Sequence, residues 1–249
     1  MVILSKESGD KEMQIEMNNP YAENPIIEEK RLHGSRRVIS KYLLESYQNK
    51  IHATMYKYLE IKKLRDFISQ NKKGSIVDHF IRAVALCLKE KPELNATFDG
   101  EIHRIFRDIN ISYAISTPRG LVTPVIRNAD RLSLEEFYQQ RKKLVSLVMD
   151  WKHEKKDILG GTFTISNLGN YSVDLFSAII NPPQVAILGM ARAFRQNISW
   201  DFSEEPSVKE LLPVSVTFDH SIIDGSGVAE FLQLLQNKIS EPENLWDNV

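Results

Sequence analysis

The sequence predicts a mixed α/β domain in which helices flank a sheet. Residues 185–190 (VAILGM) are apolar almost throughout, which is typical of a central strand buried on both faces. Residues 214–218 alternate instead, with Val214, Val216 and Phe218 on one side, as in a half-buried strand. Between such segments, apolar residues recur at the three- and four-residue spacing of amphipathic helices.

Composition narrows the function classes. The 249 residues are 42% apolar, enough to bury a core, and 32 basic residues nearly balance 33 acidic ones. Because no basic patch is interleaved with aromatic residues, we expect no nucleic-acid partner. No apolar run is long enough to span a bilayer and no targeting signal is visible, so we expect no membrane association and a cytoplasmic location. Residues 1–30, with three basic and seven acidic side chains, are expected to form a partly irregular arm before a main domain over residues 31–249.

The first helix is expected to begin near Arg36, because the apolar residues that follow share one helical face. These residues are Val38, Ile39, Tyr42 and Leu43. The pattern then predicts a strand over residues 51–59 and a helix over residues 61–70, before Gly74 interrupts it.

The next helix has a clear start and stop. Ser75 and Asp78 have the spacing of a capping box, and Pro92 ends the helix. We interpret His79 as a structural histidine on the surface of this helix. Cys87, the single cysteine, excludes an internal disulfide, and its apolar helical neighbours favour a core position over a nucleophilic role.

A β-hairpin and a further helix follow. Residues 111–116 and 121–126 are strand-like, and the TPRG segment between them is typical of a turn. Because proline donates no hydrogen bond, Pro124 predicts an edge or a bulge in the second strand. Ser133 and Glu136 form a second capping box, which opens a long amphipathic helix.

Two strand ends carry polar side chains that could do chemistry. One strand ends at Ser166 and Asn167 and is broken by Gly169. The Ser166 hydroxyl could cap a turn, or it could donate a hydrogen bond to an oxyanion.

The second such end is His220, which follows the strand over residues 214–218 and precedes the glycine-rich start of a helix. Three interpretations compete: a histidine satisfied by a backbone carbonyl, a general base, and a metal ligand. The metal ligand ranks last, because no HExxH-like partner lies nearby, and we expect no metal.

The segment FDHSIIDG resembles the signature of the dihydrolipoamide acyltransferase catalytic domain, the core component of 2-oxoacid dehydrogenase complexes. An isolated HxxxDG is a weak signal, but five further segments resemble successive parts of the family in the right order, from about Arg31 to Leu245. They are RRVISKYLLES, SIVDHFIRAVALCLKEKPELNATF, ISYAISTPRGLVTPVIRNADRLSLEEF, GGTFTISNLG and INPPQVAILGMARA. The resemblance implies a two-layer fold like that of chloramphenicol acetyltransferase, and trimers, or larger cages of trimers, whose active sites lie in channels between subunits.

The resemblance also implies roles for individual residues. His220 would be the general base, Ser166 of the neighbouring subunit the oxyanion donor, and Asp224 a support for the histidine loop. Asn167 and Gly225 would support the site or contact coenzyme A. One departure is Ser221, which stands where many members carry arginine, so any charge contact of that arginine is missing.

The implied reaction exchanges an acyl group between dihydrolipoamide and coenzyme A, the latter serving as a substrate. Because the N-terminal stretch is too short for a lipoyl domain, the lipoyl group is expected on a separate domain or protein. The partners would be that carrier and the 2-oxoacid dehydrogenase components. Two alternatives stay open: an acyltransferase with another acceptor, and a non-catalytic trimeric core subunit. A serine hydrolase is disfavoured, because no GxSxG motif occurs.

Two further expectations concern the chain's surface. A partly buried Asp224 would need a cation, and Arg36 is the candidate; the alternative is a solvated arginine on a helix. Leu245 and Trp246 near the C-terminus are expected to be an exposed apolar pair, and the family resemblance implies that it docks into another trimer.

Overall fold

A computed structural model describes residue 25 and residues 27–199 and 205–247. The expected arm over residues 1–30 therefore lies mostly outside the described residues. From Gly34 onward the helices are α1 (Gly34–Asn49), α2 (Lys62–Asn71), α3 (Ile76–Glu90), α4 (Leu134–Met149), α5 (Lys155–Ile158) and α6 (Gly225–Ser240), with short 3-10 turns at Pro92–Leu94, Gly169–Tyr171 and Pro242–Leu245. The strands are β1 (His52–Glu60), β2 (Ala96–Phe98), β3 (His103–Ile105), β4 (Ile111–Thr117), β5 (Gly120–Val122), β6 (Val125–Ile126), β7 (Phe163–Asn167), β8 (Ala186–Met190), β9 (Phe194–Ile198) and β10 (Ser207–Asp219).

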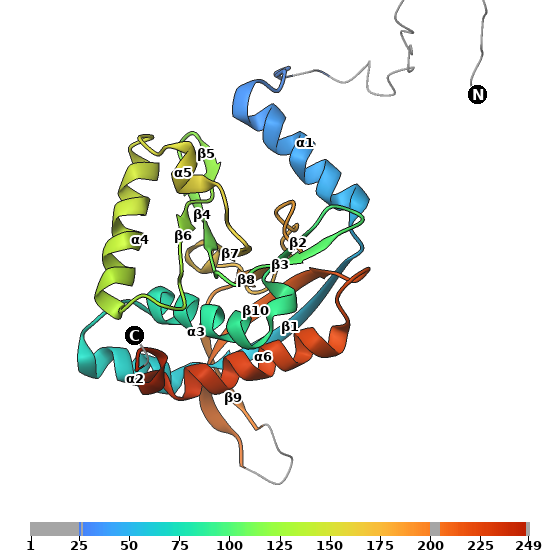
Figure 1. Ribbon diagram of the computed structural model, residues 1–249. Coiled ribbons are helices and arrows are strands. Elements are labelled where there is room, and N and C mark those ends of the chain that lie inside the picture. Colours follow the sequence, from blue (N-terminus) through green and yellow to red (C-terminus); the bar gives the residue numbers. More distant parts are fainter. Residues whose placement is uncertain (1–24, 26, 200–204, 248–249) are drawn as a thin grey trace, which may run out of the picture. The chain divides into compact units, whose positions relative to one another are not determined.

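The main sheet is mixed, as predicted (Figure 1). Its hydrogen-bonded order is β1-β10-β8-β7-β4-β5, with β6 also paired to β4 and β9 to β10. β4, β7 and β8 are parallel, and the other pairs are antiparallel. All five residues of β8 are buried between β7 and β10, which confirms the prediction of a central strand.

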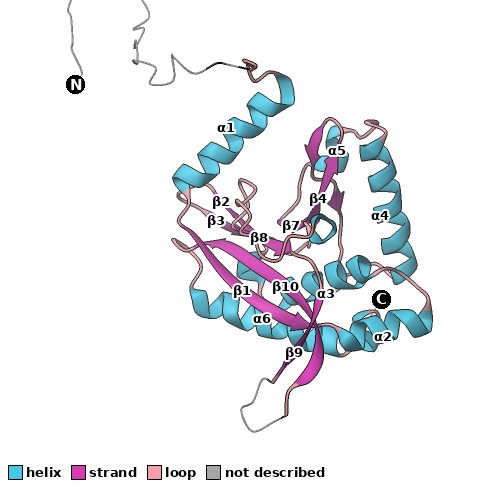
Figure 2. Cartoon of the chain, turned by 180° about the vertical axis from the view of Figure 1, so that it is seen from behind, coloured by secondary structure: helices cyan, strands magenta, loops and turns pink. Residues whose placement is uncertain are grey.

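Helices α2, α3 and α6 lie together against the sheet and enclose the main core (Figure 2). Phe163 of β7 and Phe231 of α6 pack with their ring centroids 6.2 Å apart. Both predicted capping boxes form, at Ser75 for α3 and at Ser133 for α4. No helix in the described part of the chain is long and apolar enough to cross a membrane.

The residues of α3 are more deeply buried than the sequence suggested. Cys87 is buried, and burial raises the pKa of its thiol well above the ordinary value, so the prediction of a core cysteine is confirmed. His79 is fully buried, and its placement on the helix surface was wrong. Its ring lies edge-on between Phe67 and Trp246, and Nδ1 lies 3.0 Å from the Ser75 carbonyl.

The C-terminal segment reverses another expectation. Leu245 is buried in the core, and Trp246 packs edge-on against His79 and Phe137. The Arg82 guanidinium lies 5.1 Å from a Trp246 ring centroid and donates to the Leu245 carbonyl at 2.8 Å. The expected exposed pair is therefore wrong, because these side chains dock onto their own chain.

The hairpin and the first helix form with differences. β5 and β6 both pair with β4, and the interruption between them falls at Thr123 and Pro124, as the proline predicted. The apolar face of α1 is not buried within the chain: Val38 and Tyr42 are more than half exposed. β10 begins at Ser207, earlier than predicted, because it extends into an exposed pair with β9 that has no burial pattern to mark it.

Candidate active site

His220 follows the last residue of β10 and is exposed, although the strand before it is buried. Its backbone N–H donates to the Ile51 carbonyl at 2.8 Å, and its ring packs on Phe218 with centroids 5.4 Å apart. No hydrogen bond to a ring nitrogen of His220 is found among the described residues. The backbone is fixed while both ring nitrogens stay free, so the geometry leaves the imidazole available for proton transfer.

The residue before His220 is a buried carboxylate that the sequence did not single out. Asp219 Oδ1 accepts from the Ser221 hydroxyl at 2.6 Å, the Ser221 N–H at 3.1 Å and the Ile51 N–H at 3.3 Å. Lys50 Nζ lies 3.5 Å from Asp219 Oδ2. A lysine in a loop and an aspartate beside a catalytic motif gave no pattern in sequence, because their contact joins positions far apart in the chain.

Asp224 is exposed and stands at the N-cap position of α6 without a side-chain cap hydrogen bond. The described ion pairs include none between Asp224 and Arg36, and Arg36 is exposed on α1. The expected Arg36–Asp224 ion pair is therefore not formed within the chain. Asp224 does not require a cation, because its carboxylate is exposed to solvent. Gly225 lies close to Met55, whose methyl end would be 2.7 Å from an added Cβ.

Ser166 and Asn167 end β7 as predicted. Asn167 Oδ1 accepts from the Gly169 N–H at 2.9 Å, and its amide nitrogen donates to the Tyr113 hydroxyl at 3.3 Å. Asn167 therefore holds the turn that follows the strand. The Ser166 side chain is half-buried, and its hydroxyl has no hydrogen bond to any described residue. A hydroxyl in this state is free to serve a ligand.

The sheet does not bring Ser166 and His220 together within one chain. Ser166 lies opposite Gly189 of β8, and Gly189 lies opposite Ser215 of β10. His220 is five positions beyond Ser215, which at roughly 3.3 Å per residue displaces it by about 16 Å along the strand direction. One thioester carbonyl cannot contact both side chains of a single chain.

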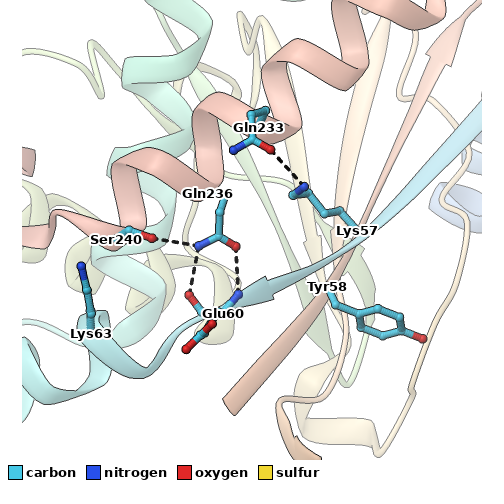
Figure 3. A pocket seen from close by; sticks show the side chains of 7 residues that line it. All are labelled: Lys57, Tyr58, Glu60, Lys63, Gln233, Gln236 and Ser240. Carbon is cyan, nitrogen blue, oxygen red and sulfur yellow. Dashed lines mark hydrogen bonds between the residues drawn. The ribbon is translucent and has the colours of Figure 1, made fainter. Parts of the chain in front are cut away.

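Four cavities lined by described residues contain none of the site residues predicted from the sequence. A cavity of about 480 Å³ lies between β1 and α6 (Figure 3). There Gln236 accepts from the Glu60 N–H at 2.9 Å and donates to the Glu60 carbonyl at 3.2 Å, so it fastens the strand end to the helix. No cluster of histidine, cysteine and acidic side chains suited to a metal ion occurs among the described residues.

The arrangement of the sheet and helices matches that of known acyltransferases. A solved chloramphenicol acetyltransferase superposes with a TM-score of 0.55 over 81% of this chain and 93% of its own, at 15% identity, a level that speaks for the fold alone. Two solved structures, one of them a dihydrolipoamide acetyltransferase, score 0.85 at 29% identity, over 91% of this chain and 96% of theirs. One is from Azotobacter vinelandii and was studied for the role of a serine, a histidine and an asparagine in catalysis; the other is the cubic core of a pyruvate dehydrogenase multienzyme complex.

The family follows from sequence comparison. Residues 24–246 match the family of 2-oxoacid dehydrogenases acyltransferase (catalytic domain), and the chain belongs to that family. The dihydrolipoyllysine-residue acetyltransferase component of the Rickettsia bellii pyruvate dehydrogenase complex is 34% identical over 252 residues, which is 96% of this chain and 59% of that protein. The Zymomonas mobilis counterpart is 33% identical over 85% of this chain and 50% of its own length. The chain thus spans about half the length of these relatives.

Proposed function

We propose that residues 31–249 form an acyltransferase catalytic domain that exchanges an acyl group between dihydrolipoamide and coenzyme A. The observation that carries the proposal is His220, which stands exposed at the end of a buried strand with its backbone fixed and its ring nitrogens free. The family assignment and the names of the relatives agree with this chemistry.

In the proposed reaction, His220 removes the proton from the coenzyme A thiol as its sulfur attacks the acyl-dihydrolipoamide carbonyl carbon. A free thiol has a pKa of about 8.5, so little thiolate exists at neutral pH and a base is needed. The tetrahedral oxyanion accepts a hydrogen bond from the Ser166 hydroxyl. When the carbon–sulfur bond to dihydrolipoamide breaks, the leaving sulfur takes the proton back from His220. Acyl-coenzyme A and dihydrolipoamide are the products.

Ser166 in this scheme comes from a neighbouring subunit. Two observations support an oligomer: the separation of Ser166 from His220 along the sheet, and the exposed apolar face of α1. Val38 and Tyr42 of that face are more than half exposed, as are Leu44 and Tyr47 elsewhere on α1. Exposed apolar surface of this kind is typical of an interface. We propose a trimer, which larger cages of trimers can incorporate, as in the cubic core mentioned above.

The proposed partners are a lipoyl carrier, on a lipoyl domain or a separate protein, and the 2-oxoacid dehydrogenase components. The relatives carry the names of pyruvate dehydrogenase components, which supports this set of partners. We place the protein in the cytoplasm, because these relatives are bacterial proteins.

The test is an acyl-transfer assay of the purified protein with free dihydrolipoamide and a series of acyl-coenzyme A thioesters, followed by the same assay on His220→Ala. Loss of a general base costs about 10²- to 10⁴-fold in rate. We expect the variant to lose activity to that extent while keeping its assembly size and circular dichroism spectrum. Near wild-type turnover in the variant would show that His220 is not the general base. Transfer to amines or alcohols in place of thiols would show that the protein is an acyltransferase with another acceptor.

A further inference from the structure

We propose that Lys50 is a positioning residue for His220 and acts through the buried carboxylate of Asp219. The proposal rests on the function assigned above, in which His220 is the base. Lys50 lies between α1 and β1, in the segment that runs alongside the end of β10. Neither residue was assigned a role from the sequence.

The backbone of Ile51 forms hydrogen bonds with both Asp219 and His220. The Ile51 N–H donates to Asp219 Oδ1 at 3.3 Å, and the Ile51 carbonyl accepts from the His220 N–H at 2.8 Å. The same Asp219 oxygen accepts from both the N–H and the hydroxyl of Ser221. The position of His220 in space is therefore fixed on both sides by contacts that depend on where the Asp219 carboxylate lies.

The second oxygen of that carboxylate needs a charge partner. Asp219 Oδ2 is buried and accepts no hydrogen bond among the described residues. The side chains of Lys50 and Asp219 are 6% and 0% exposed, and their 3.5 Å contact is an ion pair without hydrogen-bond geometry. Lys50 Nζ instead donates to the Phe98 carbonyl at 3.3 Å, which holds the ammonium group in place. A buried charge without a partner is strongly unfavourable, so each residue of the pair keeps the other in position.

No other charged group competes for either member within the described structure. Lys50 is the single cation within 4.0 Å of Asp219 there, and Ser221 offers only a neutral hydroxyl. Lys50 also lines a cavity of about 530 Å³ with Glu45, Asp99 and Pro182, among other residues. Asp99 is occupied by Arg104, whose contact lowers the pKa of the Asp99 carboxyl, and Glu45 is exposed on α1. Asp219 is therefore the acidic residue with which Lys50 pairs in the described structure.

The proposal is tested with Lys50→Met, which removes the charge but keeps the side-chain length, and Lys50→Arg, which keeps the charge. The matched control is Lys57→Met, because Lys57 lies on β1, the strand that follows Lys50, and its hydrogen bond among the described residues goes to the neutral Gln233. Misplacement of a catalytic group by about 1 Å costs on the order of 100-fold. We expect Lys50→Met to lower kcat about 10- to 100-fold with the KM for coenzyme A changed less than about twofold. Lys50→Arg should keep kcat within about fivefold of wild type, and the control within about twofold.

A double variant, Lys50→Met with Asp219→Asn, removes both charges and guards against a single variant that fails to fold. Asparagine Oδ1 can still accept from Ile51 and Ser221, so we expect the double variant to lose no more kcat than the worse single variant. Losses that multiply across the two changes would overturn the pairing. A rise in KM as large as the fall in kcat would make Lys50 a ligand contact of the cavity instead.

A measurement independent of activity separates this proposal from the proposed function. Amide hydrogen exchange at His220 and Ser221 should be at least about tenfold faster in Lys50→Met, whereas exchange in β8 and in the Lys57→Met protein stays at the wild-type rate. Unchanged exchange at His220 would refute the positioning role, whatever the enzyme transfers. A different result would separate the two proposals: exchange at His220 is faster in Lys50→Met, but the wild-type protein transfers no acyl group or His220→Ala keeps wild-type turnover. In that case the Lys50–Asp219 pair positions His220, and the proposed function is wrong.

Discussion

The end of β10 and the end of β7 both present a polar side chain, but different forces hold them. At the end of β10, the His220 N–H donates to the Ile51 carbonyl, and the Ile51 N–H donates to Asp219, whose carboxylate is paired with Lys50. At the end of β7, Ser166 precedes Asn167, which holds its turn with neutral hydrogen bonds to Gly169 and Tyr113. In the proposed mechanism, the residue that changes charge in each cycle would thus be positioned through an ion pair, whereas the neutral donor would be positioned by neutral groups.

The comparison also shows that neither end is a complete site. His220 and Ser166 lie on β10 and β7, with β8 between them, and are offset along the sheet. Each end would have to face the complementary end of another chain. A symmetric trimer provides this arrangement, because every subunit then supplies one base and one donor to different interfaces.

The largest expected effect tests that sharing directly. Ser166→Ala should lower kcat about 10²- to 10³-fold, as removal of an oxyanion donor does, with a smaller effect on coenzyme A binding. If His220→Ala and Ser166→Ala proteins are unfolded, mixed in equal amounts and reassembled, about a quarter of the shared sites combine two intact residues. We therefore expect activity to return to about a quarter of wild type, measured after each parent alone has been reassembled as a control.

The opposite outcome is equally informative. If both residues act within one chain, every chain in the mixture carries one defect and no site is intact. Mixed assemblies that stay as inactive as their parents, although sedimentation shows that subunits have exchanged, would therefore contradict the shared site.

A smaller effect is expected at the second residue of the β7 end. Asn167→Ala removes the hydrogen bonds to the Gly169 N–H and the Tyr113 hydroxyl, and each such bond contributes about 0.5–1.5 kcal/mol net. We expect kcat to fall about tenfold through loss of the Ser166 position, and the melting temperature to drop by a few degrees. Tyr113→Phe is the matched control, because it removes one of the two bonds and should produce the milder change. A loss of coenzyme A affinity without a change in kcat would instead mark Asn167 as a substrate contact.

Much of the fold could be predicted from local pattern. The apolar run of β8 and the capping boxes at Ser75 and Ser133 each report one physical preference of a short segment. The alternation at Val214 to Phe218 located a strand correctly, but the prediction that it is half-buried was wrong, because Ser215 and Thr217 are buried as well. The placement of Ser166 and His220 at strand ends could be predicted for the same reason.

What could not be predicted depends on contacts between distant segments. His79 has the sequence surroundings of a surface histidine, yet it is buried because Trp246, far along the chain, closes over it. Lys50 resembles any solvated lysine until the fold places Asp219 next to it. The amphipathic pattern of α1 indicates that the helix needs a partner, but not whether that partner belongs to the same chain, and Val38 and Tyr42 are exposed within this one.

The smallest expected effect concerns Arg36, which sequence reasoning assigned to the His220 end as the partner of Asp224. Both side chains are exposed and no ion pair joins them within the chain, and exposed pairs contribute at most about 1 kcal/mol. Arg36→Ala should therefore change kcat by less than about twofold, as should Arg37→Ala, the adjacent exposed arginine on α1 that serves as the control. A large loss confined to Arg36→Ala would show that Arg36 contacts the site in the assembly. The double variant Arg36→Ala with Asp224→Ala would then show whether Asp224 is the partner of Arg36. If the two residues pair across two subunits, the double variant should be no worse than either single variant, whereas independent roles give losses of kcat that multiply.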